Sequence, residues 1–201
     1  YTHILNMEPV HGWMSPVYWI FGSIAHPNMI LPRWYTEGLA VYTESKISGD
    51  GGRLNSQYLG GLARTLTLEK KWDDYPLSDL NDGHPDWLGG SRAYLFGGIL
   101  WDSITSDGGD EVIYKMNQSY SRRVPFFLNG VLRDNTGRSY EDQLSRAYKI
   151  WSVRAQKQLD IIAETPQLPG EQVTKVDDGL FVIPKISSDG LWMAYVSHDL
   201  E

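Results

Sequence analysis

The stretch Trp34-Tyr35-Thr36-Glu37-Gly38-Leu39-Ala40-Val41-Tyr42 places a single carboxylate near the start of a segment that is otherwise mostly apolar and aromatic. Its small and aromatic residues predict a buried helix from Trp34 to about Ser45, which the Ser48-Gly49-Asp50-Gly51-Gly52 turn ends. A carboxylate buried in such a helix needs a cation beside it. Glu37 could instead favour the helix amino end by opposing the helix dipole, but that explanation does not account for the residues around it.

If the cation beside Glu37 is a metal ion, His3 is a second candidate ligand. It lies in Tyr1-Thr2-His3-Ile4-Leu5 at the amino end of the chain. It fits the second histidine of a His-Glu-x-x-His helix, with Tyr1 and Thr2 as the two intervening residues. Histidines four positions apart project from one face of a helix, and the glutamate beside the first can act as a general base. An ordinary terminal histidine would look the same when taken alone. The chain starts where the first histidine and the glutamate would have ended, so we expect a fragment of a longer parent protein.

Together, His3 and Glu37 resemble the metal site of gluzincin metallopeptidases, in which two histidines and a glutamate from the next helix hold zinc and leave a position for water. The resemblance includes Trp34 and Gly38, which match the Trp-x-x-Glu-Gly-x-Ala element of these enzymes. It covers most of residues 1–160 and is to the carboxy-terminal subdomain of bacterial, peptidase MA-like members. It implies that a preceding histidine, His3 and Glu37 hold zinc in the parent protein. The fragment alone is expected to bind zinc weakly or not at all and to be inactive.

Two features depart from this pattern. The interval between His3 and Glu37 is longer than in thermolysin-like enzymes. Val41 stands where those enzymes carry an acidic residue one turn after the ligand. These differences concern the surroundings of the third ligand and leave its identity as predicted.

Tyr94 is the candidate catalytic side chain. The segment Tyr94-Leu95-Phe96-Gly97-Gly98 resembles the Tyr-x-x-Gly element by which gluzincin aminopeptidases supply a phenol to the tetrahedral intermediate. A tyrosine that packs in the core would fit the same pattern. Glu44, two turns after Glu37 on the same helix face, is a candidate to hold a ligand histidine, although a solvated surface carboxylate is the simpler interpretation. Structural or exposed roles fit the loop residues His11, His26 and His84 better than substrate contacts.

Composition predicts a folded, water-soluble chain. The sequence has 201 residues, 41% of them hydrophobic and 12% aromatic, and no apolar run near the length of a membrane span. A net charge of −7 without basic clusters argues against nucleic acid or an anionic membrane surface as a partner. Because cysteine is absent, disulfides and thiol catalysis are excluded, and only histidine and carboxylate remain as metal ligands.

Residues 1–164 are expected to form a mainly α-helical subdomain, after an insertion rich in loops before Pro32. Between Ser45 and residue 163, apolar residues recur at helical spacing in several segments. Ser139 and Asp142 form a capping box at the start of the last segment. The predicted helices after Ser45 cover about residues 59–71, 92–105, 110–120, 125–133 and 139–163.

The carboxyl end changes in composition. Residues 165–172 are predicted to be a linker, and residues 173–201 contain two strand-like runs separated by Ser188-Asp189-Gly190, a hairpin turn. Residues 186–195 resemble the Ser-Pro-Asp-Gly repeat of TolB-like β-propellers, with Ser188 in place of proline. This similarity implies that the chain stops as a propeller begins. A hairpin without its sheet is expected to pack on the helices or to pair with a second copy, which gives a possible dimer.

The resemblance implies that the parent is a zinc-dependent peptidase that hydrolyses peptides or proteins with metal-activated water, in the periplasm or cell envelope. The alternative is a non-enzymatic helical interaction module joined to a propeller binding platform. A His-Glu pair immediately before Tyr1 in the parent would favour the peptidase.

Overall fold

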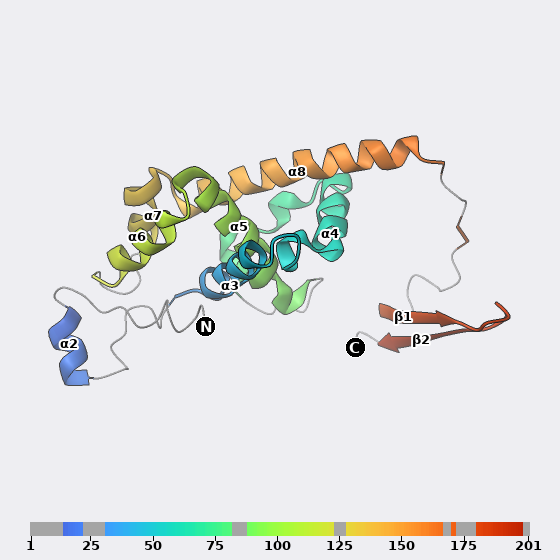
Figure 1. The fold of residues 1–201 in the computed structure, drawn as a ribbon, viewed down its shortest axis with the longest axis horizontal. Helices are drawn as coiled ribbons and strands as arrows, with labels where there is room; N and C mark the ends of the chain where they lie inside the picture. The colour runs from blue at the N-terminus through green and yellow to red at the C-terminus, as the bar shows by residue number, and fades with distance from the viewer. Residues whose placement is uncertain are drawn as a thin grey trace. The chain divides into compact units, whose positions relative to one another are not determined.

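The computed structural model describes residues 14–21, 31–81, 88–122, 128–166, 170–171 and 180–198. These residues are mainly helical and end in one short antiparallel hairpin, which confirms the coarse fold class (Figure 1). The chain divides into two compact units, Tyr1–Ile162 and Ala163–Glu201, each described here by itself. The described α-helices are α2 (Met14–Phe21), α3 (Arg33–Ile47), α4 (Gln57–Leu68), α5 (Arg92–Gly108), α6 (Glu111–Tyr120), α7 (Leu128–Thr136) and α8 (Tyr140–Glu164). None of the helices described in these ranges is long and apolar enough to cross a lipid bilayer.

Helix α2 differs from the sequence-based expectation. This helix of eight residues lies inside the segment before Pro32 that was predicted to be rich in loops. Pro16 is in the first turn of α2, where a missing backbone N–H removes no intrahelical hydrogen bond. A short helix can therefore form there despite the proline.

Helices α3 and α5 form the centre of the first unit and make the most extensive contact among the described elements. The two helices are tied by Trp101, whose indole N–H donates to the Tyr35 carbonyl oxygen at 2.9 Å. The rings of these two residues also meet edge to face, with centroids 4.9 Å apart. Both side chains are fully buried, so the hydrogen bond and the apolar contact together fix α5 against α3.

Short 3-10 turns connect the central helices. After α3, the turn η3 (Arg53–Asn55) leads to Ser56, whose hydroxyl accepts a hydrogen bond from the Leu59 N–H and caps α4. The turns η4 (Trp72–Asp74) and η5 (Leu77–Leu80) follow α4, and η6 (Gly89–Ser91) precedes α5.

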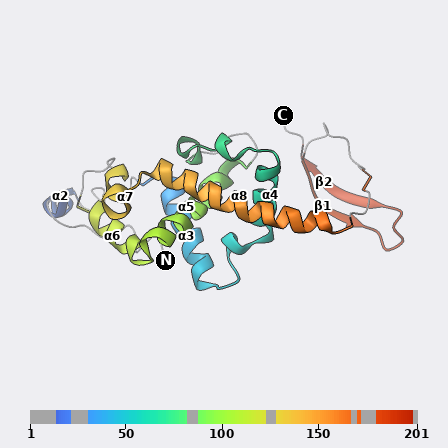
Figure 2. The same cartoon turned by 90° about the horizontal axis from the view of Figure 1, so that it is seen from above.

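Helix α8 lies across α5 and α4 in both ribbon views (Figures 1 and 2). The predicted capping box begins it, because the Ser139 hydroxyl accepts from the Asp142 N–H at 3.1 Å and the Asp142 carboxylate accepts from the Ser139 N–H at 3.4 Å. Further along, the Tyr148 hydroxyl donates to the Tyr75 carbonyl at 2.8 Å. The Tyr148 contact and the burial of Leu144 and Ala147 show that one face of α8 packs on the helical core.

The second unit contains strands β1 (Leu180–Ile186) and β2 (Met193–His198), which pair antiparallel with Val182 opposite Val196. The predicted turn joins them, and Gly190 has the positive φ of 73° that such a turn requires. The Asp189 carboxylate accepts hydrogen bonds from the Ser187 hydroxyl and the Leu191 N–H. The hairpin prediction is therefore confirmed, whereas the propeller remains a prediction.

Candidate functional site

Helices α3 and α5 touch backbone to backbone at Gly38 and Gly97. A Cβ atom added to Gly38 would lie 2.3 Å from the Gly97 carbonyl carbon, and one added to Gly97 would lie 2.2 Å from the Trp34 carbonyl oxygen. No side chain larger than hydrogen fits at either position without moving a backbone. The glycine of the Trp-x-x-Glu-Gly element thus contacts the glycine of the Tyr-x-x-Gly element, so two motifs that are separate in the sequence meet in space.

Glu37 directly precedes this crossing and is half-buried. The expectation of a fully buried carboxylate is wrong, because α3 buries only one of its sides. The 3.6-residue period places Glu37 on the opposite stripe, which is open or partly open to solvent. The stripe consists of Arg33, Glu37, Ala40, Glu44 and Ile47. Burial alone therefore does not demand a cation at Glu37.

Val41 occupies the position at which thermolysin-like enzymes carry an acidic residue, and it is fully buried. It packs against Gly98 of α5, where an added Cβ would lie 2.9 Å from Val41 Cγ1. A carboxylate at this position would be buried against the α5 backbone without a partner, which is costly. The departure from the thermolysin-like pattern therefore has a packing reason.

Glu44 forms an ion pair with Arg53 at the end of α3. The Arg53 Nε and Nη2 atoms donate to the same carboxylate oxygen, Glu44 Oε2, at 2.8 and 2.6 Å. Both side chains are a little over two-fifths exposed. Glu44 is thus a partly solvated carboxylate with a fixed cation, and its suggested contact with a ligand histidine stays a prediction.

Tyr94 lies on the first turn of α5, three residues before Gly97, and is half-buried against the core. The guanidinium carbon of Arg53 lies 5.4 Å from the centre of its ring. Arg53 thereby links Tyr94 to Glu44, which lies two turns from Glu37 on the same face of α3. Glu37 and Tyr94 therefore both lie within one turn of the same helix crossing.

The remaining predicted residues lie outside the described part of the chain. His3, His11, His26 and His84 all fall in this category, so the expected approach of His3 to Glu37 stays a prediction. Within the described residues, no three His, Cys, Asp or Glu side chains gather closely enough to hold a metal ion. Glu37 is accordingly the one predicted zinc ligand whose position the structure gives.

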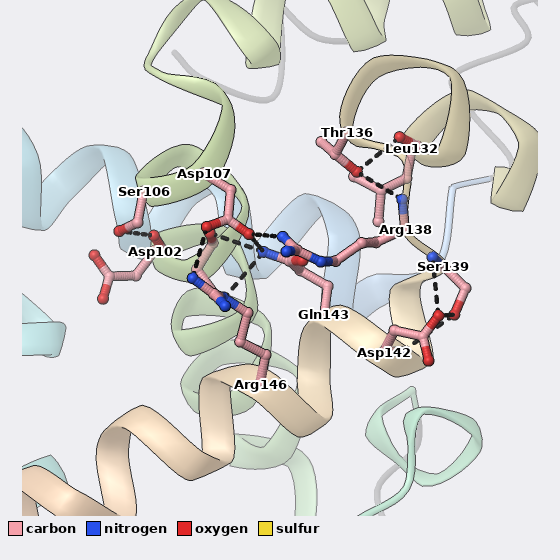
Figure 3. Close-up of polar contacts among 11 residues, drawn as sticks. Asp102, Ser106, Asp107, Leu132, Thr136, Arg138, Ser139, Asp142, Gln143 and Arg146 are labelled. Carbon is pink, nitrogen blue, oxygen red and sulfur yellow. Dashed lines mark hydrogen bonds and ion pairs between the residues drawn. The ribbon is translucent and has the colours of Figure 1, made fainter.

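Sequence reasoning missed a cluster of polar side chains around Asp107, at the last turn of α5 (Figure 3). Arg138 donates to its Oδ2 atom, Arg146 donates to Oδ1 at 3.0 Å, and the amide of Gln143 donates to Oδ2 at 3.0 Å. The Gln143 amide also donates to the Ser103 carbonyl at 2.9 Å. This cluster joins α5 to the start of α8, and no local spacing in the sequence marks it, because the partners lie 31 to 40 positions apart.

Several titratable groups are shifted by their surroundings. Burial raises the pKa of the Tyr35, Tyr140 and Tyr148 phenols, which stay protonated in the core. Burial also raises the pKa of Asp102, although Arg154 opposes the effect from 3.7 Å. A hydrogen bond from the Tyr42 hydroxyl, at 2.7 Å, lowers the pKa of Asp110. None of these five groups is a predicted site residue.

A surface hollow of about 760 Å³ lies between α8 and the segment that joins α4 to η4. Lys70, Trp72, Arg138 and Lys149 are among its lining residues, and Glu37, Glu44 and Tyr94 are not. The hollow is therefore separate from the helix crossing that carries the candidate residues.

Comparisons of this chain with protein-family models, with curated proteins and with solved structures give no match.

Proposed function

We propose that this chain is part of a gluzincin-type zinc peptidase, in which Glu37 is a zinc ligand and Tyr94 stabilises the oxyanion. The contact between Gly38 and Gly97 is the observation that supports this proposal most directly. It brings the helix that carries Glu37 and the helix that carries Tyr94 together at one point. A packing role for either motif alone would not require both to meet there.

The described residues fit the zinc site in part. Glu37 offers a carboxylate, a ligand type that zinc accepts, on the half-open face of α3. His3 and a histidine that precedes Tyr1 in the parent would complete the set. When bound, zinc would lower the pKa of a water molecule and polarise the peptide carbonyl.

The chain's own residues would position the reaction. Tyr94 would donate a hydrogen bond from its neutral hydroxyl to the carbonyl oxygen as that oxygen gains negative charge. The packing of Tyr94 against the core would hold the phenol in one orientation, because a half-buried ring has few alternative rotamers. A glutamate before Tyr1 would accept the proton of the attacking water. The substrate would be a peptide or protein, and the location would be the periplasm or cell envelope.

The test is the zinc content of the parent protein, purified with the residues that precede Tyr1 and measured by mass spectrometry. We expect one zinc per chain, lost in Glu37→Gln. The matched control is Glu69→Gln, because Glu69 lies at the end of α4, is half-exposed and pairs with Lys71. Full zinc content in Glu37→Gln would refute the ligand assignment.

The alternative function is a helical module joined to a propeller that binds a partner. The hairpin favours it, since its apolar side chains Ile183, Ile186, Leu191 and Trp192 are all at least two-thirds exposed. A parent that contains no zinc and still binds a protein partner through the propeller would support this alternative.

A further inference from the structure

Arg53 is held in place by the turn that follows α3. Gly52 enters this turn with a φ of 79°, and an added Cβ would lie 2.5 Å from the Cα atom of Ser45. The Ser45 hydroxyl accepts a hydrogen bond from the Leu54 N–H at 3.0 Å. The Asn55 amide donates to the carbonyls of Gly49 and Gly51 at 2.8 and 2.9 Å. These contacts direct the chain back along α3, so that Arg53 reaches Glu44.

The guanidinium group then contacts two candidate site residues at once. Two of its N–H groups bind Glu44 Oε2, and its carbon lies over the Tyr94 ring at 5.4 Å. A planar cation is attracted to the face of an aromatic ring, and Arg provides this geometry better than Lys. Arg53, itself held by Glu44 of α3, therefore restricts the Tyr94 ring.

Among the described residues, hydrogen bonds reach only one oxygen of the Glu44 carboxylate. Both hydrogen bonds from Arg53 go to Oε2, and within the described residues Oε1 has no hydrogen-bond partner. Oε1 could accept the N–H of a zinc-ligating imidazole, the contact that commonly orients such a ligand. A single carboxylate would then link the metal ligands to the cation that holds Tyr94.

We propose that Arg53 is a positioning residue that couples Glu44 to Tyr94 and fixes the phenol where it meets the oxyanion. This inference rests on the proposed function, because it assigns a role to Tyr94 in the reaction. The pair is not a major source of stability, since ion pairs that are two-fifths exposed are screened by water. Its importance is expected in turnover.

The first experiment tests the geometry in this chain by NMR, without any need for activity. The Arg53 Nε–Hε resonance should be shifted upfield by the Tyr94 ring current, and Tyr94→Leu should abolish that shift. Glu44→Gln should reduce it, because the guanidinium loses its fixed partner. An Arg53 resonance that does not change in Tyr94→Leu would overturn the proposal.

The second experiment measures turnover in the parent protein. Arg53→Gln should lower kcat about tenfold with unchanged KM and zinc content, and Arg53→Lys should give a smaller loss. In a Tyr94→Phe background, Arg53→Gln should add no further loss, because the hydroxyl it positions is already gone. The control is Arg64→Gln, which should leave kcat unchanged, because Arg64 donates a hydrogen bond to Gln158 near the carboxyl end of α8.

The outcomes separate the two proposals. If Tyr94→Phe leaves kcat unchanged, the oxyanion role and with it the proposed positioning role are refuted. If Tyr94→Phe lowers kcat but Arg53→Gln does not, the proposed function stands and the positioning role is refuted. Independent, multiplicative losses in the double variant would likewise refute the coupling of Arg53 to Tyr94.

Discussion

Replacing Gly38 by alanine tests the helix crossing on which the candidate site depends. The new Cβ would lie 2.3, 2.5 and 2.6 Å from the carbonyl carbon, Cα and oxygen of Gly97. These are backbone atoms that cannot rotate away, so α3 and α5 must separate. Overpacking of this kind costs about 3 kcal/mol, the upper end of the usual range. The better helix propensity of alanine offsets about 1 kcal/mol of this cost, so the free energy of unfolding should fall by about 2 kcal/mol.

The matched control is Gly61→Ala in α4. An added Cβ there meets only the Nη2 end of Arg64, at 3.8 Å, so the substitution should stabilise the chain by about 1 kcal/mol. Urea unfolding followed by tryptophan fluorescence and far-UV circular dichroism measures both variants. For a chain of this size, Gly38→Ala should lower Tm by about 4–8 °C. A Gly38→Ala variant as stable as Gly61→Ala would refute the backbone contact.

Three further predictions follow from other parts of the chain. Because burial raises the pKa of Asp102 in the folded state, its ionisation lowers stability as pH rises from the unfolded to the folded pKa. Asp102→Asn should therefore stabilise the fold by about 0.5 kcal/mol at pH 7 and have no effect near pH 3, and equal effects at both would contradict this. Tyr94→Phe in the parent should lower kcat by the loss of about 3 kcal/mol of transition-state stabilisation while Tm stays unchanged. Unchanged kinetics would show that Tyr94 only packs in the core. A chain that ends at Pro166 should stay monomeric in light scattering, whereas self-association without the tail would place the dimer surface in the helices.

The sequence by itself determined the features that depend on neighbours along the chain. The spacing of apolar residues predicted the helices from α3 to α8, Ser139 and Asp142 predicted the start of α8, and Ser188-Asp189-Gly190 predicted the hairpin turn. Each of these signals lies within one or two turns of backbone, so local geometry suffices to form it. The short helix α2 was not predicted, because its segment was expected to be rich in loops; its proline lies in the first turn, which tolerates one.

Only the tertiary structure decided how the candidate residues stand relative to one another. It brought Gly38 against Gly97, placed Glu37 on the open side of α3 and set Arg53 over the ring of Tyr94. It also gathered the partners of Asp107, none of which a motif had indicated. These contacts join residues that are dozens of positions apart, and which of them meet depends on how whole helices pack. Packing of this kind follows from the combined shape of many side chains, which no local spacing in a single sequence encodes.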